Sequence, residues 1–143
     1  MSDDIKKKID VVFVAGGKFH DIDFARLEIL KLLAEDDRMK TRVFEDYSNL
    51  HAIENADFLI TYTCDVRPTL EQQKALKKYV ASGKRWLALH GTNSILQFMS
   101  DGKVDSPRIA PIMMETLGSQ FIAHPPIEPY NVKVSQPDHP LVE

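Results

Sequence analysis

Short apolar runs alternate with longer segments of helical periodicity along this chain of 143 residues. Ile9–Ala15, Asp57–Thr63 and Trp86–Leu89 each carry apolar side chains at nearly consecutive positions. Such runs are typical of strands in a parallel sheet that is covered on both faces. Thr41–Glu45 predicts one further short strand.

Between these strands, apolar residues recur every three to four positions, which predicts amphipathic helices. Phe24–Glu35 has this spacing, and either Asp21 or Asp23 can cap the start of that helix. A second helix opens with Thr69 and Gln72, which are spaced as a capping box. The alternation of strands and helices predicts an open, doubly wound α/β sandwich with a mainly parallel sheet.

The remaining segments have weaker patterns. Ser48–Asn55 predicts a loop with a helical turn, and Ser94–Met99 could begin a helix directly after the Trp86–Leu89 strand. Ile112–Leu117 predicts a short helix, and Tyr130–Ser135 alternates apolar and polar residues as a strand does.

Composition indicates one ordinary globular domain over residues 1–143, with 43% hydrophobic and 27% charged residues. The net charge of -3 gives no reason to expect nucleic-acid binding, and no apolar run is long enough for a membrane span. The single Cys64 fits a reducing cytoplasm. An apolar pair at the very end, Leu141 and Val142, suggests that the domain continues in a longer parent chain.

The most informative stretch is the end of the Trp86–Leu89 strand, where the chain turns sharply at His90, Gly91 and Thr92. Enzymes with a nucleophile elbow place a catalytic Ser or Cys on such a corner. Here the corner residue is His90, and we interpret it as functional, because an aliphatic or small residue would suffice for structure alone.

Strand-to-helix loops of a parallel sheet all emerge at its carboxyl edge, where ligands bind. This topology predicts that His20 and His90 lie near one another, and the loop that carries His124 could fold over the same edge. Gly16 and Gly17 have two open interpretations: backbone N–H groups that cradle a ligand, or the tight turn that a strand-to-helix connection requires.

Two chemistries suit three loop histidines. His20, His90 and His124 could bind a divalent metal such as zinc, with a fourth position open. Alternatively, the imidazoles act as acid, base or hydrogen-bond donors towards a sugar-like ligand. Both alternatives remain open at this point.

The chain resembles ThuA-like domains, a family named for trehalose utilisation, in several motifs that occur in the same order. The stretches that carry the resemblance are Gly16-Gly17-Lys18-Phe19-His20-Asp21, Leu87-Ala88-Leu89-His90-Gly91-Thr92, Leu117-Gly118-Ser119-Gln120-Phe121 with His124-Pro125, and Asp138-His139-Pro140. The resemblance implies a flavodoxin-like three-layer sandwich in the superfamily of class I glutamine amidotransferases. It also implies carbohydrate utilisation, with a pocket at the carboxyl edge of the sheet.

The sequence departs from both groups in ways that bear on chemistry. Class I amidotransferases carry a cysteine at the elbow, whereas this chain has His90, so a cysteine mechanism is the weakest interpretation. The acidic Asp-Glu-Leu-Tyr motif that follows in ThuA-like domains is missing, which fits a C-terminal truncation.

We therefore expect small-molecule chemistry in which His90 is the central acid–base or ligand group and His20 its partner. Substrate-binding residues would be Gly16, Gly17, Gly91, Thr92 and His124. The rival interpretation is a non-catalytic sugar-binding or regulatory module, and assembly into a homo-oligomer stays open.

Overall fold

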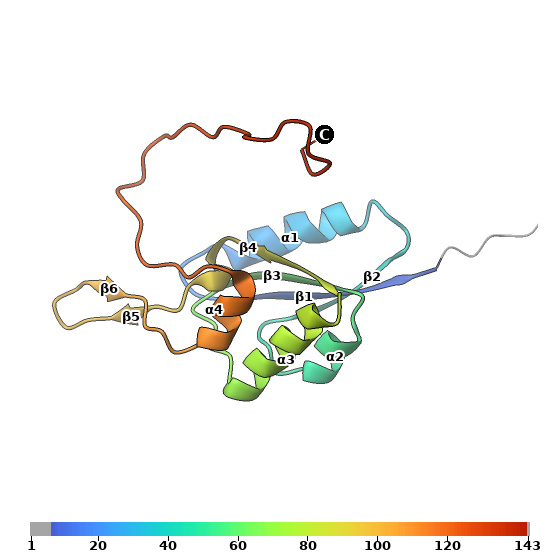
Figure 1. Ribbon diagram of the computed structural model, residues 1–143, viewed down its shortest axis with the longest axis horizontal. Helices are drawn as coiled ribbons and strands as arrows, with labels where there is room; N and C mark the ends of the chain where they lie inside the picture. Colours follow the sequence, from blue (N-terminus) through green and yellow to red (C-terminus); the bar gives the residue numbers. More distant parts are fainter. Residues whose placement is uncertain (1–6, 143) are drawn as a thin grey trace, which may run out of the picture.

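The computed structural model describes residues 7–142 and contains a four-stranded parallel sheet in the order β2-β1-β3-β4 (Figure 1). Its strands are β1 (Ile9–Gly17), β2 (Met39–Phe44), β3 (Phe58–Cys64) and β4 (Arg85–Leu89). β1 and β3 occupy the centre, and each pairs in parallel with a neighbour on both sides. All four strands therefore end at one carboxyl edge.

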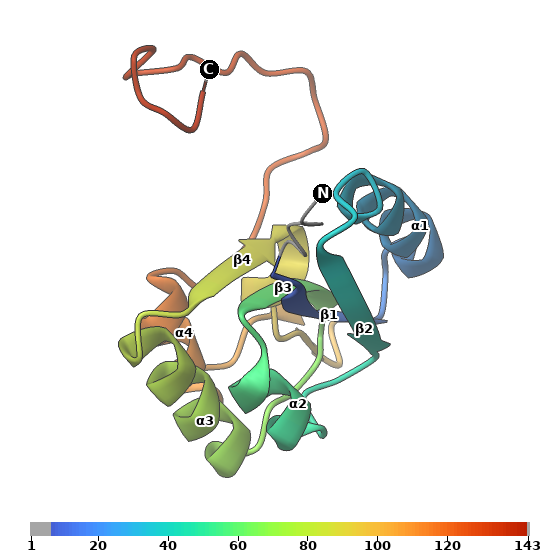
Figure 2. The same cartoon turned by 90° about the vertical axis from the view of Figure 1, so that its right-hand side faces the viewer.

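Helices cover both faces of the sheet. α1 (Ile22–Leu33) lies on one face, and α2 (Leu50–Asn55), α3 (Leu70–Ala81) and α4 (Pro111–Leu117) lie on the other (Figure 2). The predicted flavodoxin-like α/β sandwich with a parallel sheet is thus confirmed.

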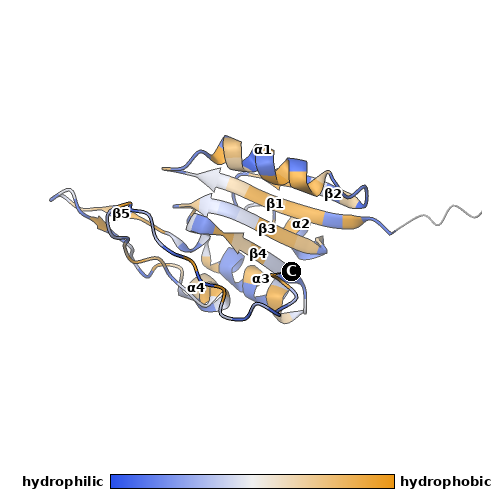
Figure 3. Ribbon diagram, turned by 90° about the horizontal axis from the view of Figure 1, so that it is seen from above, coloured by the Kyte–Doolittle hydropathy of each residue, from blue (hydrophilic) through white to orange (hydrophobic). Residues whose placement is uncertain are grey.

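The alternation of β1 side chains explains this layering. Val12 and Val14 point into a core shared with α2, α3 and α4, where Tyr47, Ile53 and Leu76 are almost fully buried. The intervening residues of β1 pack on the other side against α1. Because both faces of the strand are covered, every one of its central positions has to be apolar, and in Figure 3 the first halves of the central strands are coloured accordingly.

The predicted helix starts are confirmed. The Asp21 carboxylate accepts a hydrogen bond from the Phe24 N–H at 2.9 Å. Thr69 and Gln72 form the full capping box that opens α3. The polar stretch predicted as a loop with a helical turn contains α2, because the Asn49 side chain caps the Ala52 N–H at 3.0 Å.

The helix predicted at Ser94–Met99 is wrong. After β4 the chain makes a single 3-10 turn, η1 (His90–Asn93), and then a hairpin of β5 (Gln97–Phe98) and β6 (Val104–Asp105). The Ser94 carbonyl accepts the Asp65 N–H at 2.9 Å, which holds the chain in an extended conformation against the end of β3. A helix cannot continue through a residue held in this way.

The strand predicted at Tyr130–Ser135 does not form in the structure. This segment belongs to an exposed stretch without regular structure that follows α4 and leaves the body of the domain on the α1 side (Figures 1 and 2). Within residues 7–142, no helix combines the length and apolar character that crossing a membrane requires.

Candidate functional site

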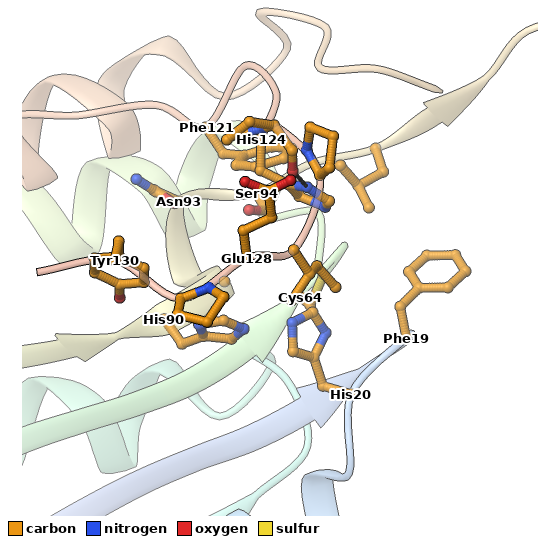
Figure 4. A pocket seen from close by; sticks show the side chains of 16 residues that line it. Phe19, His20, Cys64, His90, Asn93, Ser94, Phe121, His124, Glu128 and Tyr130 are labelled. Atoms are coloured by element: carbon orange, nitrogen blue, oxygen red, sulfur yellow. Dashed lines mark hydrogen bonds between the residues drawn. The ribbon is translucent and has the colours of Figure 1, made fainter. Parts of the chain in front are cut away.

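A cavity of about 850 Å³ opens at the carboxyl edge of the sheet (Figure 4). One side is built from the ends of β1, β3 and β4, and the other from the stretch around Phe121–Tyr130. Its volume lies within the usual range for small-molecule sites, and its lining is mainly apolar and aromatic with a few polar groups, as such sites generally are.

His20 and His90 meet in this cavity although 69 residues lie between them in the sequence. Their ring centroids are 4.4 Å apart with an interplanar angle of 69°. Tyr62, on the strand between them, stacks under His90 at 5.7 Å and meets the edge of His20 at 6.4 Å. The predicted proximity of the two histidines is confirmed.

Strained backbone marks all three loops that support this pair. Among the described residues, the non-glycine residues with positive φ are Phe19 (67°), Asp65 (56°) and His90 (47°). Each follows a different strand at the carboxyl edge, after β1, β3 and β4 respectively. Left-handed residues other than glycine cost free energy and concentrate at functional sites, so their gathering here supports a functional edge.

The environment of His90 favours a neutral imidazole. The residue is accessible from the cavity, but its ring packs between Tyr62 and His20. Partial burial of the ring, followed by the nearby His20, lowers the pKa of His90 below its ordinary value of 6.5. A neutral imidazole offers one N–H donor and one lone pair, which suits a ligand hydroxyl.

Gly16 and Gly17 do not line the cavity, because they are the last residues of β1 and pair with Thr63 and Cys64 of β3. A Cβ on Gly16 would lie 2.0 Å from the Glu45 carbonyl oxygen, and one on Gly17 would lie 1.9 Å from that of Cys64. Gly17 also has a φ of 109°. The doublet is thus required by close strand packing, which accounts for both glycines without a ligand.

Thr92 is likewise structural, whereas Gly91 reaches the cavity. The Thr92 side chain is buried, and its hydroxyl lies 2.8 Å from the Leu89 carbonyl oxygen and 3.1 Å from that of Thr61. Gly91 packs so tightly against β3 that a Cβ would lie 2.9 Å from the Thr63 carbonyl oxygen. Together they fix the corner on which His90 stands.

Asp65 has a larger role than the surface pair with Arg67 that its sequence position suggests. Its side chain is only 4% exposed, and it accepts hydrogen bonds from the Leu96 N–H at 3.0 Å, Arg67 at 3.2 Å and Lys18 at 3.3 Å. Burial raises the pKa of this carboxyl, but these hydrogen bonds outweigh the effect and hold the pKa below its ordinary value. Asp65 thereby ties the loop after β1 to the segment after the elbow.

His124 lines the opposite side of the cavity, where its ring lies 6.1 Å from that of Phe121 (Figure 4). Its Nδ1 is 2.8 Å from the Pro125 carbonyl oxygen. Throughout residues 7–142, no three His, Cys, Asp or Glu side chains are grouped so that they could hold a metal ion. The predicted zinc triad of His20, His90 and His124 is therefore not assembled in this structure.

Cys64 also borders the cavity but is not poised as a nucleophile. The residue is 2% exposed at the end of β3, as its place after a strand predicts. Burial, and then the nearby charge of Asp65, raise the pKa of the thiol. Because the thiolate is the reactive form, this environment disfavours Cys64 as a nucleophile.

No family model matches this sequence, and neither a curated protein nor a solved structure matches it. The ThuA-like resemblance therefore stays a prediction. What the chain can do has to be argued from the geometry of the cavity itself.

Proposed function

We propose that this chain is a ThuA-like domain that takes a small sugar-like molecule into the cavity at the carboxyl edge of its sheet. The observation that carries the proposal is the pair of imidazoles, His20 and His90, whose centroids lie 4.4 Å apart at the elbow. The order of the family motifs along the chain supports the same assignment.

The chemistry of the lining suits a hydroxyl-rich ring. Two neighbouring imidazoles can exchange hydrogen bonds with vicinal hydroxyl groups, because each neutral ring carries one donor and one acceptor. Phe121 and Tyr130 present aromatic surface in the same cavity, and such surface packs against the C–H faces of a sugar. In this proposal His90 is the acid–base group and His20 its partner.

A non-catalytic sugar-binding module is the second candidate, and one observation favours it. Among the described residues, no carboxylate accepts a hydrogen bond from either ring, and the partner of His20 Nδ1 is the Lys18 carbonyl oxygen at 3.2 Å. General bases of the Ser-His-Asp type are oriented by such a carboxylate.

The test is a titration of the ¹⁵N-labelled protein with trehalose, sucrose, glucose and the non-cyclic polyol sorbitol, followed by amide chemical shifts. We expect shifts at the carboxyl-edge loops with the cyclic sugars. In His90→Asn the affinity should fall at least about tenfold. Asn is chosen because it tolerates the left-handed backbone at this corner. His51→Asn, at an exposed position of α2, is the matched control and should bind as the wild type does.

Product formation in the same samples distinguishes the two candidates. A sugar that binds and is converted supports the enzyme, and one that binds without conversion supports the module. If none of the sugars shifts the carboxyl-edge amides, or if His51→Asn and His90→Asn weaken binding equally, the site assignment is wrong.

A further inference from the structure

The exposed stretch after α4 contains a segment with the pattern of a strand. In residues 130–135, Tyr130, Val132 and Val134 are 84%, 81% and 53% exposed, and polar residues occupy the positions between them. Alternation with a period of two is the pattern of a strand with one buried face. Proline residues at 129 and 137 bracket the segment, which suits an edge strand.

The sheet has a matching vacancy beside β4. Within residues 7–142, β4 pairs with β3 alone, so its outer edge carries no strand. α1 packs against β1, β2 and β3, and the half of the sheet next to β4 has no helix above it (Figure 2). On that face Leu87 is 45% exposed. Open edges with apolar neighbours are normally covered in native proteins.

The attachment point of the exposed stretch places residues 130–135 within reach of the open edge of β4. The Phe121 N–H donates to the Asn93 carbonyl oxygen at 3.1 Å, which anchors the exposed stretch next to the carboxyl end of β4. Eight residues, 122–129, follow the anchor and span up to about 26 Å when extended. The other open edge, that of β2, lies three strand spacings further away, or about 14 Å.

We propose that residues 130–135, which form no strand in the structure, close onto the outer edge of β4 in solution and pair with it as a fifth strand. Because the segment starts at the carboxyl edge and runs back along the sheet, it lies antiparallel to β4, an arrangement common at the edge of parallel sheets. Tyr130, Val132 and Val134 then extend the apolar row of Leu87 over the uncovered half of the sheet. The pairing also fixes the Phe121–Tyr130 side of the cavity, and it stands whether or not the proposed function does.

Disulfide scanning tests this pairing at residue level. In a Cys64→Ala background, Leu87→Cys is combined with a cysteine at each position from 130 to 135 in turn. Disulfides need Cβ atoms within about 4.5 Å, so only positions on the same face as residue 87 can react efficiently. We expect high yields of intramolecular disulfide at 130, 132 and 134, with the best yield at the directly opposed position, and low yields at 131, 133 and 135.

Ala88→Cys is the matched control, because residue 88 is exposed and faces the other side of β4. It should invert the pattern and favour 131, 133 and 135. Amide hydrogen exchange of the unmodified chain is the second measurement, with slower exchange expected in 130–135 than in 138–142.

Three results would overturn the proposal. Equal yields at odd and even positions would mean a free tail, and disulfide-linked dimers as the main product would mean exchange between two copies. Exchange in residues 130–135 as fast as in 138–142 would show that no such strand forms. Circular dichroism of each variant confirms that the domain itself is folded.

Discussion

Removing the Thr92 hydroxyl should destabilise the protein and disturb the corner that carries His90. Thr61 and Thr92 are almost fully buried, and their hydroxyl oxygens are 3.1 Å apart. The Trp86 indole N–H already donates to the Thr61 hydroxyl at 2.9 Å. In Thr92→Val the Thr61 hydroxyl loses a partner and the Leu89 carbonyl loses its contact at 2.8 Å. A buried polar group without a partner costs about 1–3 kcal/mol, and we expect a loss of about 2 kcal/mol.

Urea unfolding followed by the fluorescence of Trp86, the single tryptophan, measures this loss directly. With a slope of about 2 kcal/mol per M, the midpoint should fall by about 1 M. Thr92→Ser is the matched control, because it keeps the hydroxyl and removes only a methyl group, so it should be the more stable of the two variants. A wild-type midpoint for Thr92→Val, or a serine variant that is less stable than the valine variant, would show that the buried hydroxyl does not stabilise this corner.

Substitutions of three further residues at the carboxyl edge of the sheet should change stability in specific ways. The pKa of His90 in the folded state lies below its ordinary value of 6.5, so the unfolded state binds the proton first as the pH drops. The free energy of unfolding therefore falls between pH 6.5 and the lower folded pKa. Urea unfolding at pH 7.5 and 5.5 should show a smaller fall in stability for His90→Asn than for the wild type. Asp65→Asn should cost about 1–3 kcal/mol in the same assay at neutral pH, with the difference from wild type shrinking as acid protonates Asp65, and an unchanged midpoint would contradict its linking role. Gly17→Ala should lower the free energy of unfolding by more than about 3 kcal/mol. Gly83 also has a positive φ, but no atom lies within 4 Å of its new Cβ, so Gly83→Ala should cost only about 1 kcal/mol. Equal losses in the two variants would mean that the contact with Cys64 is unimportant.

The layered fold could be predicted because its signals are local. β-branched runs such as Val11–Val14, caps at Asp21 and Thr69, and helical spacing in α1 and α3 each act over a few residues. The helix that was predicted wrongly at Ser94–Met99 lies in a segment whose conformation depends on a distant partner. The extended conformation after η1 depends on Asp65, whose backbone N–H holds the Ser94 carbonyl from 29 positions away.

Part of the site could be predicted for a topological reason. His20 and His90 follow strands that end at one edge, so a parallel order was enough to place them together. The role of Asp65 could not be predicted, because the burial of its side chain decides that role and the sequence around it does not show this burial. The two glycines were ambiguous because a Gly-Gly pair after an apolar run fits both a ligand cradle and tight strand packing, and only the approach of Glu45 and Cys64 to the backbone separates these.

The absence of a helix after the elbow restricts what His90 can do. In a nucleophile elbow the strand leads directly into a helix, and the N–H groups at its start stabilise the negative charge of an acyl intermediate. Here the four residues of η1 are followed by extended chain at Ser94, so no helix continues directly from this corner. The lowered pKa of His90 also favours the neutral form of its imidazole ring at this corner. Both features support the proposed role of His90 as a hydrogen-bond donor and acceptor towards a neutral ligand, rather than a role in covalent acyl transfer.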